Sequence, residues 1–290
     1  MIELCAFADE AATAFAEQLA VLKEHGISWV ELRGVDGKNV SKLSDTEAQN
    51  CASLLQENGI RVWAIGSPLG KVPLSAAAEH MQEVRRVCRL AQIFQTKRIR
   101  MFSFYESGED KAAVIEALRA MCEIASSYGV VLCHENEKGI YGDTPVRVRE
   151  ILDALPSLCS VFDPANYVQC GVPVAQALDR LFEQTDYFHI KDVIAETGEL
   201  VPAGYGDGAI EAIVSRIRTS GRDAVLTVEP HLQSFVGYTE IDTEEMKHRF
   251  HFASTRESFA AAVHVLKGIL SAQGLRETAL DQTRKGWYTV

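Results

Sequence analysis

Four carboxylate or imidazole side chains stand at the ends of four apolar segments of the chain. They are Glu135 in VVLCHEN, Asp163 in SVFDP, His189 in YFHIKD and Glu229 in VLTVEP, spaced 28, 26 and 40 residues apart. Three carboxylates and one imidazole suit one divalent metal ion, with Mn²⁺ as the first expectation and Mg²⁺, Co²⁺ or Zn²⁺ as alternatives. A carboxylate that follows an apolar run is costly to bury unless it is paired, protonated or bound to metal.

Two of these residues also have a simple structural explanation when they are considered alone. Asp163 precedes Pro164, and Asp before Pro commonly starts a turn. His189 lies in an apolar segment, where a histidine can be a core side chain that bonds to the backbone. Coincidence of all four residues at corresponding points of consecutive strands is much rarer, so the set favours a single metal site.

The segments that must position these residues alternate between strand-like and helix-like patterns. Strand-like runs cover residues 2–8, 28–32, 60–65, 98–104, 130–135, 159–163, 186–191 and 224–229. One helical pattern begins with Ser44 and Glu47 at the spacing of a capping box and ends before Gly59. The predicted helices cover residues 11–25, 44–58, 76–94, 109–128, 145–155, 173–183, 207–219 and 254–271.

Strands that alternate with helices indicate parallel βαβ units, and eight such units are the number that closes a barrel. We therefore predict an α/β fold, a single (β/α)8 TIM barrel over residues 1–271, with a short C-terminal tail over residues 272–290. An open, doubly wound sheet is the alternative, but the first strand region reads CAFADEAA and contains no GxGxxG turn. In a barrel the carboxyl ends of the strands meet at one mouth, where the four strand-end residues would converge.

Composition and charge argue against several classes of protein. The formal net charge of −11 makes nucleic acid an improbable partner, because proteins that bind it usually carry a basic patch. Seven cysteines without a CxxC pair are typical of reduced thiols in a cytoplasmic protein. The start MIELCAFADE does not resemble a signal peptide, and no apolar run approaches the roughly 18 residues that span a membrane. We expect a cytoplasmic protein without a membrane partner. The sequence is compatible with a homo-oligomer.

Further segments carry a family resemblance over roughly residues 1–271. They are ELRG (31–34), GSPLGK (66–71), RIRMFSFY (98–105), HENEKGIYGD (134–143), FDPANYVQCG (162–171), HIKD (189–192), PAGYGDG (202–208) and VEPH (228–231). In this order they resemble the sugar phosphate isomerase/epimerase superfamily, the xylose isomerase-like TIM barrels. That superfamily includes ketose 3-epimerases, hydroxypyruvate isomerases and inosose dehydratases. The set is specific for the superfamily and not for one reaction.

The resemblance implies roles for the strand-end residues. It assigns the metal to Glu135, Asp163, His189 and Glu229, and it makes Glu135 and Glu229 the catalytic acid and base. The implied function is a metal-dependent isomerase or epimerase of a small sugar or sugar phosphate, working through an enediolate. Removal of a proton next to a carbonyl needs a Lewis acid for the oxygen and a base for the proton. The alternative is a lyase of inosose-dehydratase or dehydroshikimate-dehydratase type with the same metal site.

Other polar side chains near the strand ends are candidates for contacts with a small-molecule carbohydrate substrate. His231 lies two residues beyond Glu229 and would point to the same side of an extended strand. Arg33 and Lys71 are candidates for contacts with an anionic group. The predicted substrate-binding set is Asn166, Lys191, Asp192, His231, Glu137, Arg33 and Lys71.

Two positions depart from the patterns of related barrels. PAGYGDG carries Tyr205 where related barrels commonly have Glu, and the ketose 3-epimerase branch has an Arg at the position of Ala195. The missing guanidinium argues against a close copy of that epimerase chemistry.

A nuclease with three zinc ions would need histidines at earlier strand ends, but the third and fourth strands end in AIGSP and FSFY. A barrel that binds a ligand without catalysis is the remaining alternative.

Overall fold

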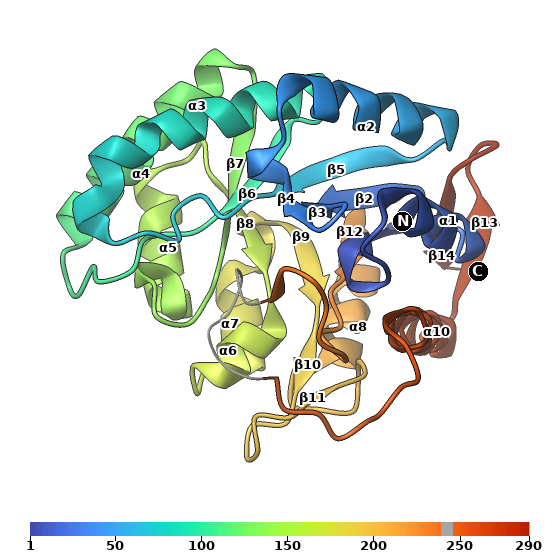
Figure 1. Ribbon diagram of the computed structural model, residues 1–290. Helices are drawn as coiled ribbons and strands as arrows, with labels where there is room; N and C mark the ends of the chain where they lie inside the picture. Colours follow the sequence, from blue (N-terminus) through green and yellow to red (C-terminus); the bar gives the residue numbers. More distant parts are fainter. Residues whose placement is uncertain (239–245, 290) are drawn as a thin grey trace.

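Eight parallel strands form a closed barrel in the computed structural model, which describes residues 1–238 and 246–289 (Figure 1). The barrel strands are β1 (Ile2–Ala6), β2 (Trp29–Leu32), β5 (Arg61–Gly66), β6 (Arg98–Met101), β7 (Val131–Glu135), β8 (Cys159–Phe162), β9 (Thr185–Ile190) and β12 (Ala224–Val228). Each strand pairs with the next one along the chain, and β12 pairs with β1 to close the ring. The predicted (β/α)8 TIM barrel is therefore confirmed.

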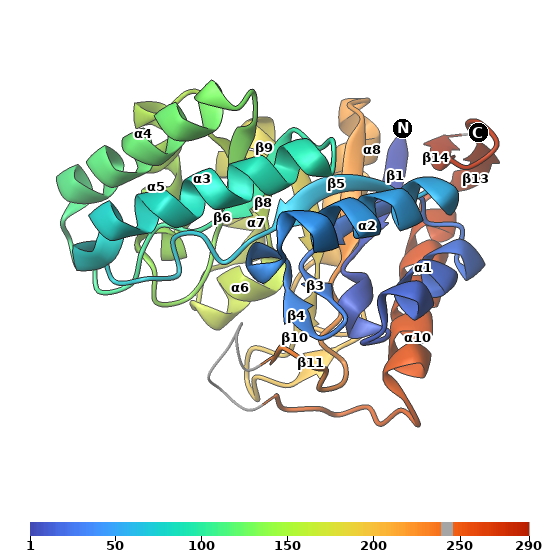
Figure 2. The same ribbon diagram turned by 45° about the horizontal axis from the view of Figure 1, so that its top comes forward.

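Helices surround the strands, and Figure 2 shows α2 and α3 side by side on the outer face of the barrel. The α-helices are α1 (Phe15–Glu24), α2 (Asp45–Glu57), α3 (Ala77–Ile93), α4 (Lys111–Ser127), α5 (Pro145–Ala154), α6 (Pro164–Gln169), α7 (Val174–Leu181), α8 (Ile210–Ser220) and α10 (Thr255–Ala272). Short 3-10 helices are η1 (Ala8–Glu10), η2 (Val40–Lys42), η3 (Leu74–Ala76), η4 (Tyr141–Asp143) and η5 (Phe182–Gln184). No helix in the described ranges is long and apolar enough to cross a membrane.

Local hydrogen bonds explain where the helices begin. The predicted capping box of α2 is present, with Ser44 Oγ accepting from the Glu47 N–H at 3.2 Å and Glu47 Oε2 accepting from the Ser44 N–H at 2.7 Å. The helix predicted from residue 11 begins only at Phe15. The 3-10 helix η1 ends at Glu10, residues 11–14 are not helical, and the Phe15 N–H donates to Asp36 Oδ1 at 2.8 Å. This acceptor is far away in sequence, so local periodicity could not indicate it.

Strand β6 is shorter than the predicted run 98–104 because its last residues leave the barrel. The Phe102 N–H donates to the Leu69 carbonyl at 2.8 Å, and the Phe104 N–H donates to the Gly70 carbonyl at 3.0 Å. A Cβ on Gly70 would lie 2.0 Å from the Phe102 carbonyl oxygen, so this close backbone approach requires glycine. The pairing holds the segment around Lys71 at the mouth of the barrel.

Two short antiparallel hairpins at the carboxyl ends of barrel strands were not predicted. The first pairs β3 (Gly34–Val35) with β4 (Lys38–Asn39), and the second pairs β10 (Asp192–Val193) with β11 (Leu200–Val201). The first begins just after β2 ends at Leu32 and the second just after β9 ends at Ile190, so the predicted site residues Arg33 and Lys191 lie at the two junctions. They are too short for an alternating pattern to be visible in the sequence.

The C-terminal tail forms a third hairpin, of β13 (Leu275–Ala279) and β14 (Lys285–Thr289), which lies beside α10 and the chain start in Figures 1 and 2. Strand β2 pairs with β1 only from Cys5 onward, so the start of β1 has a free edge. Strand β14 occupies this edge, with Ile2 opposite Trp287. Trp287 is 5% exposed and belongs to the main apolar core, so it packs against the barrel.

Replacing Trp287 with Ala should lower the free energy of unfolding by about 3 kcal/mol, because a large buried ring leaves a cavity. The free energy is measured by urea denaturation. The neighbouring Tyr288 has 36% of its surface exposed, and Tyr288→Ala should cost less than about 1 kcal/mol. Equal costs for the two substitutions would contradict a packed role for the hairpin.

Candidate metal and catalytic centre

The four strand-end residues lie together at the mouth of the barrel. Glu135 is the last residue of β7, His189 is the penultimate residue of β9, and Asp163 and Glu229 directly follow β8 and β12. One ligand atom from each side chain lies within 4.8 Å of the others, and all four residues are buried. The spatial convergence expected from strand position is therefore present.

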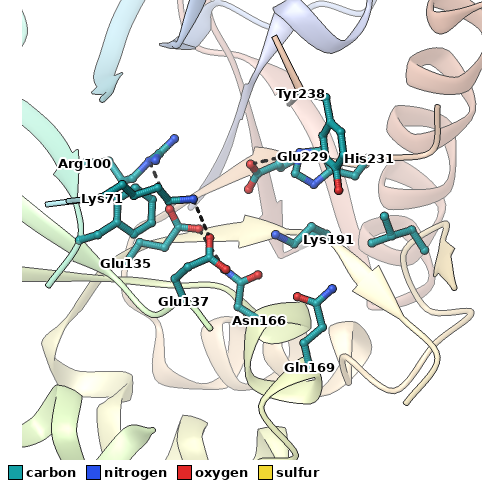
Figure 3. Close-up of a pocket in the computed structure, with 12 residues that line it drawn as sticks. Lys71, Arg100, Glu135, Glu137, Asn166, Gln169, Lys191, Glu229, His231 and Tyr238 are labelled. Atoms are coloured by element: carbon teal, nitrogen blue, oxygen red, sulfur yellow. Dashed lines mark hydrogen bonds and ion pairs between the residues drawn. The ribbon is translucent and has the colours of Figure 1, made fainter. Parts of the chain in front are cut away.

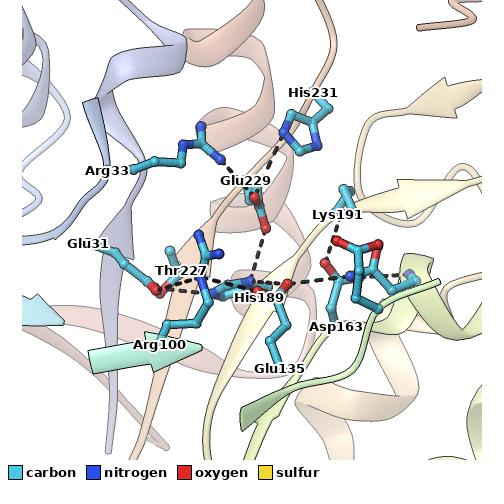
Figure 4. Close-up of polar contacts among 12 residues, drawn as sticks. Glu31, Arg33, Arg100, Glu135, Asp163, His189, Lys191, Thr227, Glu229 and His231 are labelled. Carbon is cyan, nitrogen blue, oxygen red and sulfur yellow. Dashed lines mark hydrogen bonds and ion pairs between the residues drawn. The ribbon is translucent and has the colours of Figure 1, made fainter. Parts of the chain in front are cut away.

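The imidazole of His189 lies in the middle of this group (Figure 4). Its Nδ1 is 3.0 Å from Glu135 Oε1 and 3.0 Å from Glu229 Oε2, and its Nε2 is 3.0 Å from Glu31 Oε2. Burial alone would lower the pKa of His189, but the charges of Glu135, Glu31 and Glu229 raise it well above its ordinary value. The ring is thus a shared neighbour of both glutamates.

Arginines contact the outer oxygens of the two glutamates. Arg100 Nε is 3.2 Å from Glu135 Oε2, and Arg33 Nη1 donates to Glu229 Oε1 at 2.9 Å. Each glutamate therefore has one oxygen on an arginine and the other near His189. This arrangement fixes the planes of both carboxylates.

Neighbouring cations keep both glutamates ionised. Burial raises the pKa of Glu135, but His189 and Arg100 outweigh it and leave the pKa below its ordinary value. Burial also opposes ionisation of Glu229, where Lys191 and His189 hold the pKa well below its ordinary value. Two anionic carboxylates therefore face the pocket.

The two carboxylate oxygens of Asp163 have different partners, one in the backbone of α6 and one in the side chain of Lys191. Its Oδ1 caps α6 by accepting the Asn166 N–H at 2.9 Å, so a structural role of Asp163 is present for this oxygen. Its Oδ2 is 2.9 Å from Lys191 Nζ. Burial raises the pKa of Asp163 to about 7 against the opposing charge of Lys191. One carboxylate oxygen thus stays available at the site.

The donor set fits a divalent cation. Asp163 Oδ2 and Glu229 Oε2 are buried oxygens without a hydrogen-bond partner among the described residues, and each faces a positive charge instead. Together with Glu135 and His189 they offer three carboxylates and one imidazole, which is the chemistry that Mn²⁺, Mg²⁺, Co²⁺ or Zn²⁺ accepts. Lys191 and His189 supply the positive charge that this acidic group needs.

A pocket opens beside these residues (Figure 3). It is lined by Lys71, Arg100, Phe102, Glu135, Glu137, Asn166, Gln169, Lys191, Leu200, Glu229, His231 and Tyr238. Five of the seven predicted substrate contacts are among them, namely Asn166, Lys191, His231, Glu137 and Lys71. The other two, Arg33 and Asp192, do not line this pocket.

Arg33 lies behind Glu229 rather than in the pocket. Its guanidinium is 3% exposed and contacts Asp9 Oδ2 at 2.9 Å, Glu10 Oε1 at 3.0 Å and Glu229 Oε1 at 2.9 Å. Three carboxylates therefore occupy the fork that was expected to hold an anionic group of a ligand. The structure places this cation where it orients a glutamate.

Asp192 organises the loop that was quoted for the family resemblance. Its carboxylate accepts backbone N–H groups of Gly204, Gly206, Gly208 and Val193 at 2.8 to 3.0 Å. The helix predicted from residue 207 begins only at Ile210, because the residues before it belong to this loop. The side chain of Asp192 thus has four partners without a ligand.

His231 and Lys71 stand on opposite walls of the pocket. The His231 ring stacks on Phe235 at 5.6 Å, and its backbone N–H donates to Glu10 Oε2 at 2.7 Å. Lys71 Nζ is 3.1 Å from Glu137 Oε2 and 4.4 Å from the centre of the Phe102 ring. Both side chains have fixed positions from which they can contact a ligand.

Sequence reasoning did not single out Glu31, Arg100 and Tyr187, although all three are buried next to the strand-end residues. Tyr187 Oη donates to Glu31 Oε1 at 2.9 Å. The sequence did indicate two of these residues, because Glu31 and Arg100 are charged residues between apolar neighbours in predicted barrel strands. Such a charge points either into the barrel or into a helix layer, and both locations require a partner.

Asp192→Asn should lower the free energy of unfolding by about 2 kcal/mol, because an amide NH₂ group would face backbone donors and leave one without an acceptor. Hydrogen exchange at residues 202–208 should become faster. Asp207→Asn in the same loop is the control, because its exposed carboxylate accepts one N–H, from Ala195 at 2.7 Å. Identical exchange in both variants would show that Asp192 does not hold the loop.

The sequence model of the xylose isomerase-like TIM barrel family matches residues 19–250. No curated protein sequence matches the chain. Similar solved structures include the IOLI protein with a bound zinc atom (17% identity, 93% of this chain and 99% of that chain, TM-score 0.73). They also include L-ribulose 3-epimerase (16%, 94% and 95%, TM-score 0.73) and the probable 3-DHS dehydratase AsbF of Bacillus anthracis (17%, 92% and 99%, TM-score 0.68). At these identities the structures share the fold, and the match over residues 19–250 shows that the chain belongs to the xylose isomerase-like TIM barrel family.

Proposed function

We propose that the protein is a metal-dependent isomerase or epimerase that acts on a small carbohydrate. The observation that supports this best is the pair Glu135 and Glu229, whose carboxylates both lie 3.0 Å from His189 Nδ1 and line one pocket. Two ionised carboxylates beside one substrate can remove a proton and return it at another point. The proposed catalytic acid and base are therefore these two glutamates.

The proposed reaction moves one proton next to a carbonyl group. One glutamate takes the proton from the carbon beside the carbonyl, and the electrons of the C–H bond form an enediolate. In an isomerase a glutamate that has been protonated delivers a proton to the neighbouring carbon. In an epimerase the other glutamate first takes up a proton from water and delivers it to the opposite face of the same carbon, and the first glutamate then releases its proton to water. Arg33 and Arg100 keep the two carboxylates apart and oriented during this exchange.

We propose Glu135, Asp163, His189 and Glu229 as the ligands of one divalent ion, with Mn²⁺ as the first expectation. Bound there, the ion would supply Lewis-acid stabilisation of the charge that develops on the substrate oxygen. The IOLI protein, which has the same fold, holds a zinc atom in its solved structure.

The pocket favours a substrate that is rich in hydroxyl groups and without a phosphate. Asn166, Lys191 and His231 offer hydrogen bonds close to the two glutamates. Lys71 and Lys191 are each already within 3.1 Å of a carboxylate, on Glu137 and on Asp163. Their charges are therefore balanced, and a phosphate dianion would gain little from them.

A lyase that expels water from the same enediolate is the second candidate. It is favoured by His231, whose Nε2 has no hydrogen-bond partner among the described residues and whose ring lines the pocket. This nitrogen lies 3.8 Å from Glu229 Oε1 and can form a hydrogen bond with a hydroxyl group on the carbon next to the enediolate. The fold is shared with a probable dehydratase as well as with an epimerase.

Incubation with a panel of ketoses in D₂O and Mn²⁺ should introduce solvent deuterium at a carbon next to the carbonyl, because the glutamate exchanges its proton with water. Mass spectrometry and NMR of the products distinguish the candidates. Unchanged mass apart from deuterium indicates an isomerase or epimerase, and loss of 18 mass units (roughly one water) indicates the lyase. Absence of exchange with the whole panel would argue against proton-transfer chemistry on ketoses.

Glu135→Gln and Glu229→Gln should each lower kcat by about 10³-fold or more, because each removes a group that transfers the proton. His189→Ala and Asp163→Ala should lower the metal content of the purified protein. Glu3→Gln is the control, since Glu3 is a buried carboxylate that does not line this pocket. Full activity of either glutamine variant at the proposed bases would refute the two-carboxylate mechanism.

A further inference from the structure

We propose that Glu31 is a positioning residue of the metal centre, which holds the His189 ring so that Nδ1 faces the bound ion. This inference rests on the proposed function, because it assumes that His189 is a ligand. Glu31 lies in β2, does not line the pocket and is fully buried. It therefore acts through His189 and touches neither substrate nor metal.

The contacts of Glu31 are those of an orienting group. Its Oε2 lies 3.0 Å from His189 Nε2 and accepts from Thr227 Oγ1 at 3.2 Å (Figure 4). Its Oε1 accepts from Tyr187 Oη at 2.9 Å. Burial of a carboxylate is costly unless its lone pairs are occupied, and here two hydroxyls and an imidazole N–H occupy them. The side chain cannot rotate without losing one of these partners.

An ionised carboxylate can only accept hydrogen bonds, so the ring nitrogen that faces Glu31 must carry a proton. The other nitrogen, Nδ1, lies 3.0 Å from Glu135 Oε1 and from Glu229 Oε2, where a bound ion would replace the proton that this nitrogen shares with the two carboxylates. The remaining ring contacts are aromatic, with Phe7 at 5.2 Å and Tyr187 at 5.6 Å, and they restrict the plane without selecting a nitrogen. Glu31 thus holds Nε2 away from the centre and leaves Nδ1 as the nitrogen that would face a bound ion.

Metal ligands of this type lose about 10-fold to 100-fold in affinity when the outer carboxylate is removed. Protein stripped with a chelator should be titrated with Mn²⁺ and with Zn²⁺ by calorimetry, for the wild type and for Glu31→Gln. The Kd of Glu31→Gln should rise by about 10-fold or more. Absorption of the Co²⁺-loaded protein should also change, because the imidazole is no longer held in one orientation.

Glu3→Gln is the matched control. Glu3 is a buried carboxylate of β1 at the opposite end of the barrel, where it accepts from Trp29 Nε1 and Arg284 Nε at 3.0 Å each. Its replacement should leave the metal Kd unchanged although it also removes the charge of a buried carboxylate. A similar rise in both variants would mean that charge removal in general, and not orientation of His189, weakens binding.

A second variant covers the case in which Glu31→Gln does not fold. The double variant Tyr187→Phe and Thr227→Val keeps the carboxylate and removes the two hydroxyls that hold it, so the Kd should rise in the same direction. An unchanged Kd in a folded Glu31→Gln, or in the double variant, overturns the role of Glu31. Wild-type protein that binds none of the three ions would instead refute the proposed metal site itself.

Discussion

His189 Nδ1 lies between the carboxylates of Glu135 and Glu229. Because this contact brings the two carboxylates close together, the surrounding side chains must supply positive charge. Two buried anions close to one another are tolerated only if each outer oxygen also meets a positive charge. Arg100 in β6 and Arg33, which directly follows β2, meet this need from strands that carry none of the proposed ligands. Closure of the barrel is therefore a condition of the site, because only a ring brings β2 and β6 across from β9.

The need for a partner of opposite charge also applies to the residues that surround Arg33. Arg33 also contacts Asp9 and Glu10, and Glu10 in turn accepts the backbone N–H of His231. Burial raises the pKa of Glu10 to about 8, although Arg33 opposes this rise. A carboxyl that holds its proton more tightly limits the negative charge behind Glu229. The residues directly after β1 thus contribute to the electrostatics of a centre whose proposed ligands lie between residues 135 and 229.

Much of the fold could be predicted from the sequence, because strand runs and helix periodicity are local patterns. The convergence of the strand ends then followed from barrel geometry alone. What could not be predicted were partnerships between side chains on different strands, such as Arg33 with Glu229 or Glu31 with His189. Asp192 shows the same limit, since its four backbone donors come mostly from a loop more than ten residues away. The C-terminal hairpin was missed because β13 is mostly exposed and its partner strand β14 pairs with the first strand of the chain.

The glycines at the rim of the barrel have a consequence for how this protein can change. A Cβ on Gly206 would lie 2.5 Å from Asp192 Oδ1, and one on Gly70 would lie 2.0 Å from a backbone oxygen. A side chain larger than that of glycine therefore does not fit at these two positions, so no new substrate contact can arise there. Divergence toward another substrate would have to proceed through side chains already on the pocket wall, such as Gln169 and Leu200. The chemistry and the specificity of such a barrel could then evolve separately, on different residues.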